Sequence, residues 1–239
     1  MVTRIEALNY RCLKHIAVDV PQFAILIGPN ASGKSTLFDV LLFIKDMLNE
    51  GLEQAVLKWG RSVEDLTWLG KQSSLTLSLV LELPESLRSD DINERWSHIR
   101  YEIEIGTDSS SKGLNIQSEN FAFQSTEDPP RWKGVFAQGN GTLIDIMGVG
   151  SSGSGRVTGV PPAFQLPLGA GFPFLAHVAR FGRPHRYIGW TAKFLSEDVH
   201  LVVLSTTVLR RPSPALYAAT SFRPDGSNIP HLIETLKKG

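Results

Sequence analysis

Strict alternation of apolar and polar residues marks the middle of the chain. Leucine occupies every second position from Leu75 to Leu83, and the same period of two runs from Ile99 to Ile105. A strand with one buried and one solvated face has this period. Further strands are predicted over residues 114–124, 131–137 and 142–147, so that residues 75–147 form an antiparallel β-subdomain.

The N-terminal part combines short strands with one long helix. Alternation predicts two strands over residues 3–10 and 15–20, which would form a small antiparallel element of their own. The apolar run Phe23–Ile27 has the length of a buried strand. Apolar residues at helical spacing follow, and they predict a helix to about Asn49 with Gly51 as its C-terminal stop.

The C-terminal part begins with a segment that has no periodicity. Glycine, proline and serine dominate residues 148–172, which predicts a loop. Short helices are expected at Phe174–Phe181 and Tyr187–Leu195, and the apolar run Val199–Leu204 is predicted as a strand. A final helix is predicted after Asn228, because asparagine favours the N-cap position.

Composition is that of an ordinary soluble globular protein. Of 239 residues, 42% are hydrophobic, and 24 basic side chains balance 24 acidic ones, so no global basic field indicates nucleic-acid binding. The single cysteine, Cys12, excludes an internal disulfide. Polar residues interrupt any signal peptide, and no apolar run approaches the roughly 18 residues of a membrane span. We therefore expect a cytoplasmic protein.

One stretch carries a specific chemical signal. A glycine, four free positions and Gly-Lys-Ser follow the spacing of the phosphate loop (P-loop, or Walker A motif) of nucleotide-binding proteins. The predicted strand before it and the predicted helix after it supply the context that the motif requires. The expected nucleotide-binding residues are Gly28, Pro29, Asn30, Ala31, Ser32, Gly33, Lys34, Ser35 and Thr36.

Each fixed position of this motif has a physical role. Gly28 and Gly33 allow backbone N–H groups to approach a phosphate closely, and the helix start adds unpaired donors and a positive dipole end. Lys34 supplies a charge for the outer phosphates, and the hydroxyl of Ser35 is a ligand for Mg²⁺. The expected ligand is therefore a nucleoside triphosphate with Mg²⁺.

Arginines outside the motif are less informative. Arg11 lies in the connection between the first two predicted strands. From its position in the sequence, two alternatives remain open for the Arg11 side chain. The guanidinium contacts a phosphate, or it is solvated as loop arginines usually are. Arg210 and Arg211 are interpreted as surface charge.

Three segments together resemble a known family. They are Thr3–Arg11, the phosphate loop, and the sequence Arg-Pro-Asp-Gly-Ser-Asn-Ile-Pro-His-Leu at Arg223–Leu232. This combination is similar to the ABC/SMC-type ATPases of the RecF and OLD kind, which include AAA-type ATPase domains of bacterial anti-phage defence systems. The resemblance covers residues 2–36 and 199–238. In the middle of the chain it is limited to the general character of the sequence, without a shared motif.

The resemblance implies an α/β fold of the P-loop NTPase class, with a mixed central sheet that bears the phosphate loop. It also implies ATP as the nucleotide, Mg²⁺ at Ser35, and Arg11 near the phosphates. A homodimer or a partner ATPase half would meet the chain at the nucleotide site, a nuclease or DNA is a further candidate partner, and no membrane is expected. The predicted divisions are the P-loop core (1–74), the β-subdomain (75–147), the loop (148–172) and a helical return with a core strand (173–239).

The chain departs from this family in its C-terminal part. There the family has a Ser-Gly signature helix, an apolar strand that ends in Asp-Glu, and a switch histidine, whereas Ser205 and Thr206 follow Val199–Leu204 here. Hydrolysis in this class needs an acidic residue that positions water. We therefore expect the N-terminal portion of an ATPase, with no catalytic residue identified and with hydrolysis dependent on a missing segment or partner.

Other interpretations remain open. One is a non-hydrolysing nucleotide-binding module that regulates an effector such as a nuclease, and another is a P-loop kinase or GTPase. Asp145–Gly148 matches the Asp-x-x-Gly of GTPases, but no Asn-Lys-x-Asp is present to read guanine. Ser151–Gly155 superficially matches a transporter signature, yet turn residues follow it, so a loop is favoured. Gln72 is a candidate for the family's metal-contacting glutamine, in a local pattern too loose to assign it.

Overall fold

The structure is a computed structural model that describes most of the N-terminal half of the chain and parts of the rest. The described residues are 1–88, 96–107, 113–125, 132–137, 171–176, 186–203, 207, 210, 223 and 225–238. They belong to two compact units, Met1–Ser196 and Glu197–Gly239. The predicted strand 142–147, the Asp145–Gly148 motif and the Ser151–Gly155 segment lie outside the described residues.

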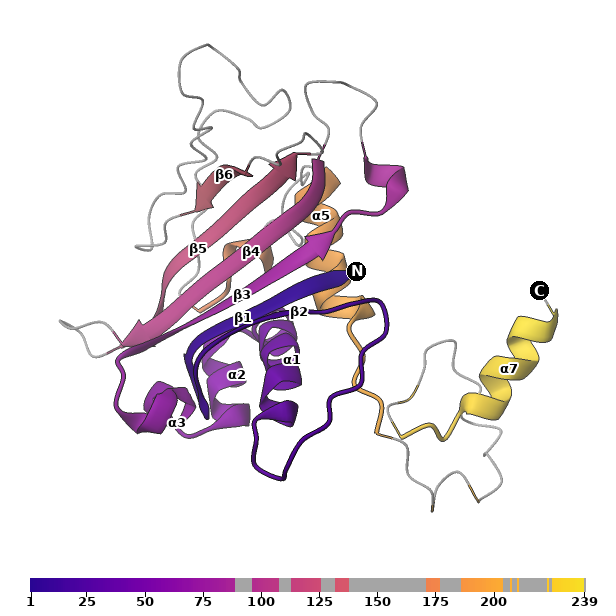
Figure 1. Cartoon of the computed structure of the whole chain (residues 1–239), viewed down its shortest axis with the longest axis horizontal. Helices are drawn as coiled ribbons and strands as arrows, with labels where there is room; N and C mark the ends of the chain where they lie inside the picture. Colours follow the sequence, from indigo (N-terminus) through magenta and orange to yellow (C-terminus); the bar gives the residue numbers. More distant parts are fainter. Residues whose placement is uncertain are drawn as a thin grey trace, which may run out of the picture. The chain divides into compact units, whose positions relative to one another are not determined.

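The first unit is built on a six-stranded antiparallel sheet with the strand order β2–β1–β3–β4–β5–β6 (Figure 1). Strands β3 to β6 follow one another as a meander, which confirms the antiparallel pairing predicted for the middle of the chain. The strands are β1 (Val2–Tyr10), β2 (Leu13–Asp19), β3 (Ser74–Glu82), β4 (Trp96–Thr107), β5 (Leu114–Ser125) and β6 (Trp132–Ala137).

The two N-terminal strands belong to this same sheet, in contrast to the separate small element predicted for them. β1 lies between β2 and β3, and its register places Ile5 opposite Leu79 and Ala7 opposite Leu77. Because side chains alternate across a strand, this register brings the apolar residues of β1 onto the leucine face of β3. The N-terminal hairpin is therefore one edge of the large sheet.

Helices α1, α2 and α5 cover one face of the sheet (Figure 1). α1 buries Val40, Phe43 and Ile44 at helical spacing, and Gly51, with a φ of 92°, ends it as predicted. Full burial of each such apolar side chain is worth about 1.5–3 kcal/mol. The helices described in this unit are α1 (Lys34–Glu50), α2 (Leu52–Trp59), α3 (Val63–Leu66) and α5 (Arg186–Lys193), with 3-10 turns at Trp68–Gly70 and Glu85–Leu87. A π-helical turn at Phe194–Asp198 follows α5 and spans the boundary between the two units.

The predicted strand Phe23–Ile27 is wrong, because the segment between β2 and α1 has no regular secondary structure. Phe23, Ile25 and Ile27 are 80%, 69% and 91% exposed. Figure 1 shows this indigo segment leaving β2 and running clear of the sheet before it enters α1. An isolated strand leaves its backbone hydrogen-bonding groups unpaired, so an apolar run becomes a strand only beside another one.

The sheet of the described residues is therefore antiparallel throughout and does not bear the phosphate loop, in contrast to the mixed central sheet that was expected. The position of the loop is instead set by α1, which follows the loop directly and packs against the sheet.

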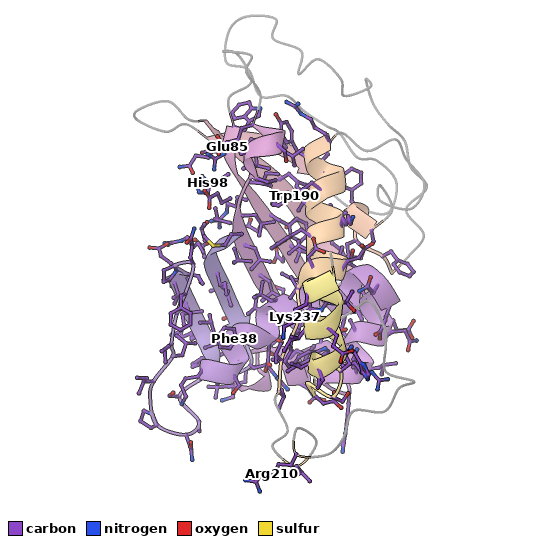
Figure 2. All side chains as sticks on the ribbon, turned by 90° about the vertical axis from the view of Figure 1, so that its right-hand side faces the viewer. Phe38, Glu85, His98, Trp190, Arg210 and Lys237 are labelled. Carbon is purple, nitrogen blue, oxygen red and sulfur yellow. The ribbon has the colours of Figure 1, made fainter. Side chains whose placement is uncertain are left out.

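α1 also has an apolar residue outside the core. Phe38, labelled in Figure 2, is 43% exposed.

The described part of the C-terminal region contains helices but no strand. α5 confirms the helix predicted at Tyr187–Leu195, and residues 174–176 are helical within the predicted helix Phe174–Phe181. Val199–Val203, most of the predicted strand Val199–Leu204, lacks strand structure, and Leu201 and Val203 are exposed.

The second unit contains the predicted final helix, α7 (Ile229–Lys238). Asn228 precedes it and is fully buried, and its side-chain oxygen accepts a hydrogen bond from the N–H of Arg223 at 2.9 Å. None of the helices within the described ranges has both the length and the apolar character needed to cross a membrane.

Candidate nucleotide-binding site

The phosphate loop turns sharply into α1. Ala31 and Gly33 have φ angles of 62° and 87°, in the left-handed region that favours glycine. A Cβ atom at Gly33 would lie 3.1 Å from Cδ2 of Leu13 and 3.4 Å from Sγ of Cys12. The backbone angle therefore favours glycine at position 33, and a Cβ there would press against the end of the Leu13 side chain, which would have to shift by a few tenths of an ångström.

The start of α1 is open to an anion. The first helical hydrogen bond runs from the N–H of Leu37 to the carbonyl oxygen of Gly33 at 3.0 Å, so the N–H groups of residues 34–36 precede the helical ladder. In the described part of the chain, no side chain caps this end and no acidic residue lies in its first turn. The helix dipole adds partial positive charge at this end, so the geometry favours a bound phosphate.

Lys34 folds back into the loop that precedes it. Its Nζ lies 2.7 Å from the carbonyl oxygen of Gly28, 2.5 Å from that of Pro29, and 3.2 Å from Oγ of Ser32. The loop is thus curled around its own cation, and three protein oxygens hold the ammonium group close to the helix start.

Ser35 lies at an exposed position in the first turn of α1. Next to it, the hydroxyl of Thr36 is 3.3 Å from the thiol sulfur of Cys12, which is itself exposed. Across the residues that the structure describes, no three acidic, histidine or cysteine residues converge to hold a metal ion. Mg²⁺ keeps most of its water ligands, so one hydroxyl beside bound phosphates fits this ion.

Arg11 lies in the β1–β2 turn and is paired with α1. Its Nη1 lies 2.7 Å from Oδ2 of Asp39, and its Cζ lies 5.5 Å from the centre of the Trp59 ring. The guanidinium is therefore neither freely solvated nor placed in the phosphate loop. The prediction that Arg11 contacts a phosphate stays a prediction.

Burial shapes the electrostatics around this ion pair. Burial raises the pKa of the Asp39 carboxyl, although the Arg11 guanidinium opposes the shift. It also raises the pKa of Tyr10, whose hydroxyl has no hydrogen-bond partner within the described residues. Removal of either partner of the ion pair would leave a partly buried charge uncompensated, which is costly.

The Trp59 ring is held in place by α1. Its Nε1 donates to Oδ2 of Asp46 at 2.7 Å, and the other oxygen of Asp46 accepts a hydrogen bond from Lys58 at 2.8 Å. Trp59 also meets Phe43 edge-on, with 6.2 Å between the ring centres. These contacts attach the end of α2 to α1 and fix the ring beside Arg11.

The structure gathers the predicted loop residues at the start of α1 and places Arg11 beside the same helix. Sequence reasoning missed three neighbours of the site, namely Cys12, Asp39 and Trp59. A signal for Asp39 was available, because it follows Ser35 by four residues and so lies on the same face of the helix. Cys12 and Trp59 have no such local signal, since their positions depend on how distant elements pack.

Two further residues singled out in the sequence are described by their own surroundings. The backbone N–H of Gln72 lies 3.4 Å from Oγ1 of Thr67, on the segment that leads into β3. Arg210, labelled in Figure 2, is exposed, in agreement with its interpretation as surface charge.

Comparison with known proteins places this site in a family context. Residues 1–128, more than half of the 239, match the family described as AAA ATPase domain. Over 47 residues the chain is 43% identical to the chromosome partition protein Smc of Methanocaldococcus jannaschii. This match covers 18% of this chain and 4% of that protein.

One solved structure is also similar. It is described as "Structural biochemistry of ATP-driven dimerization and DNA stimulated activation of SMC ATPases", and the match has a TM-score of 0.36 and 14% identity. The match covers 52% of this chain and 69% of that chain.

Proposed function

The chain belongs to the AAA ATPase domain family, and on this premise we propose that it binds ATP and Mg²⁺ through residues 28–36. The observation that carries the proposal is the position of Lys34, whose ammonium group is held inside the phosphate loop at the open start of α1. A phosphate placed there accepts hydrogen bonds from backbone N–H groups and meets the charge of the lysine.

Binding exchanges one set of acceptors for another. The phosphate oxygens replace the carbonyl oxygens of Gly28 and Pro29 as partners of Lys34, and they form stronger, charge-assisted hydrogen bonds. Ser35 supplies a hydroxyl to Mg²⁺, which neutralises part of the phosphate charge. Arg11, one residue before Cys12, supplies a further cation to the phosphates.

We also propose that hydrolysis depends on a missing segment or on a partner, either a second copy of the chain or another ATPase half. The exposed side chains of Phe23, Ile25 and Ile27, three large apolar residues within five positions, support this, because a partner that covers them would remove their apolar surface from water. The chain spans 4% of the length of the Smc protein that it matches, so the activity and partners of a whole protein are proposals. The resemblance of Thr3–Arg11, the phosphate loop and Arg223–Leu232 to the RecF and OLD kind favours a nuclease or DNA as a further partner, in a defence role.

A second candidate function is a non-hydrolysing module that regulates an effector such as a nuclease. Ser205 and Thr206 favour it, because they follow the apolar run Val199–Leu204 where the resembled ATPases have acidic residues. Both functions require ATP binding, so ATP turnover is the property that separates them.

The binding site is tested by isothermal titration of ATP and Mg²⁺ against the full chain and Lys34→Ala. We expect the variant to bind at least about tenfold more weakly, because a charge-assisted hydrogen bond to phosphate is worth about 1.5–3 kcal/mol. Lys193→Ala, which removes an exposed lysine from the end of α5, is the matched control and should bind as the wild type does. Equal affinity of Lys34→Ala and the wild type would contradict the assignment of the phosphate loop.

The single cysteine offers an independent readout of the same site. Cys12 is exposed, and its sulfur lies 3.3 Å from Oγ1 of Thr36 at the start of α1. At an ATP concentration near the dissociation constant of the wild type, bound ATP should therefore slow alkylation of Cys12 much more in the wild type than in Lys34→Ala. Equal protection would show that binding does not depend on Lys34, and no protection in either protein would place the nucleotide elsewhere.

A further inference from the structure

The guanidinium of Arg11 has two partners besides the solvent. Nη1 forms the 2.7 Å ion pair with Asp39, and the guanidinium carbon lies 5.5 Å from the centre of the Trp59 ring. Nη2 also reaches the carbonyl oxygen of Trp59, at 3.5 Å. A carboxylate of α1 and an aromatic residue of α2 thus hold the same cation, and cation–π attraction adds to the ion pair.

The backbone of Arg11 is fixed, so only its side chain is free to move. Its φ of 51° lies in the left-handed region, and its N–H donates to the carbonyl oxygen of Leu66 at 2.8 Å. The next residue, Cys12, contacts Thr36, and a Cβ at Gly33 would lie 3.4 Å from its sulfur. Because consecutive Cα atoms are about 3.8 Å apart, the turn carries Arg11 to the border of the phosphate loop.

Asp39 holds Arg11 on the same helix whose first turn begins the phosphate site. It follows Ser35 by four residues on α1 and therefore lies on the same helix face, one turn further along. Helical side chains lean toward the N-terminus, so the Asp39 carboxylate leans toward the turn that starts the site. The carboxylate holds the arginine and, as an anion, opposes the approach of phosphate.

We propose that Asp39 is a positioning residue that stores Arg11 on α1, beside Trp59, until a triphosphate competes for it. The proposal rests on the function proposed above and makes Asp39 a restraint on the ATP affinity, and on the preference for ATP over ADP, that Arg11 supplies. Release of Arg11 leaves the partly buried Asp39 carboxylate without its partner, so only an anion of high charge compensates for the exchange. The triphosphate thus gains more from Arg11 than the diphosphate does.

Substitution of Asp39 directly tests whether this residue holds Arg11 on α1. Asp39→Asn keeps the size of the side chain and removes its charge, so Arg11 no longer has to leave a carboxylate. We expect the affinity for ATP to rise about fivefold, the scale of a partly exposed ion pair, and the preference for ATP over ADP to increase. Asp39→Glu retains the charge and should return the affinity toward that of the wild type.

A double-variant cycle shows whether Asp39 acts through Arg11. In Arg11→Ala the same Asp39→Asn change should no longer increase the preference for ATP over ADP, because no cation remains to be released. An equal increase with and without Arg11 would mean that Asp39 repels the phosphate directly, and this outcome would overturn the storage. Unchanged or weaker ATP binding by a folded Asp39→Asn protein would overturn it too.

Trp59 reports the movement of Arg11 in the protein with Asp39 intact. ATP should change the tryptophan fluorescence of the wild type, and the change should be lost in both Trp59→Phe and Arg11→Ala. This measurement tests the movement of Arg11 even if Asp39→Asn fails to fold. A fluorescence change on ATP binding that persists in Trp59→Phe and in Arg11→Ala would contradict the proposal. Lys34→Ala distinguishes a failure of the proposed nucleotide site from a failure of the proposed role of Asp39. ATP binding that does not depend on Lys34 would refute the site itself, and not the holding of Arg11 by Asp39.

Discussion

Lys34 and Arg11 are both held by acceptors of the protein itself, but only Arg11 has a charged partner. Lys34 donates to two carbonyl oxygens of its own loop, and Arg11 pairs with Asp39. The two cations differ in chemistry: lysine is a compact point charge, whereas arginine has a planar fork that fits a carboxylate or a phosphate in two-point contact. In the proposed function, nucleotide binding is therefore an exchange of partners, and its free energy is the difference between phosphate and protein acceptors.

Another residue, Glu119 of β5, performs a structural task in the core. Its fully buried carboxylate accepts hydrogen bonds from the N–H groups of Phe174 at 2.6 Å and Leu175 at 3.0 Å, and from the hydroxyl of Tyr101 at 3.0 Å. It thereby attaches the segment 171–176 to the sheet. Burial raises the pKa of Glu119 to about 7, although all three hydrogen bonds oppose the shift.

The stability of the chain should therefore depend on pH through Glu119. Because the pKa is higher in the folded than in the unfolded chain, the stabilisation is complete below about pH 4.5 and is lost as the pH rises through about 7. We expect the free energy of unfolding, measured with urea, to fall by up to about 3 kcal/mol between about pH 5 and pH 8. Glu119→Gln should lack this decrease, and exposed Glu53→Gln should retain it. An identical pH profile for Glu119→Gln and the wild type would refute the assignment.

Among the elements, α1 joins the core to the candidate site. One face packs Val40, Phe43 and Ile44 into the core, and the first turn provides Lys34 and Ser35. The segment before it behaves differently, since the apolar run Phe23–Ile27 has the composition of a strand but no partner strand among the described residues. The same composition thus gives a buried element where a partner exists and an exposed segment where none does.

The exposed state of this run predicts the effect of truncating its side chains. Ile27→Ala should change the free energy of unfolding by less than about 0.5 kcal/mol, as surface substitutions usually do. Ile99→Ala, the same substitution at a fully buried position of β4, should cost about 2–5 kcal/mol. Thermal or urea unfolding of the two variants measures the contrast. A cost at position 27 comparable to that at position 99 would show that the run is packed in a sheet.

At the scale of the whole molecule, the chain divides into the units Met1–Ser196 and Glu197–Gly239. The first contains the sheet, the phosphate loop and the helix that carries it, which is the apparatus for binding a nucleotide. An acidic residue that positions the attacking water is also needed for hydrolysis. The proposed function assigns that residue to a missing segment or a partner.

The isolated chain should bind ATP without turning it over. We expect phosphate release by the wild type to equal that of Lys34→Ala at low protein concentration, because the proposed function assigns the acidic group that activates water to a missing segment or a partner. A rate that increases more than in proportion to protein concentration would identify a second copy of the chain as the partner. A substantial rate that depends on Lys34 and is proportional to concentration would show that the chain is catalytically complete.

The sequence by itself determined the features that depend on neighbouring residues. The alternation at Leu75–Leu83 indicated a strand, and helical spacing with Gly51 as a stop indicated α1. The spacing of Gly28, Gly33 and Lys34 indicated the phosphate loop, a prediction for which binding data are the test. Each of these signals lies within a short window, because backbone propensity and side-chain periodicity act over a few residues.

Only the tertiary structure decided what depends on distant residues. The pairing of β1 with β3, the ion pair of Arg11 with Asp39, and the attachment of Phe174 to Glu119 each join segments far apart in the chain. No local pattern encodes such a choice of partner, because a hydrogen bond or ion pair is made with whatever group the packing brings within reach. Phe23–Ile27 illustrates the same limit. Its apolar composition predicted a strand, but no neighbouring strand pairs with it in the described structure, and its side chains are exposed.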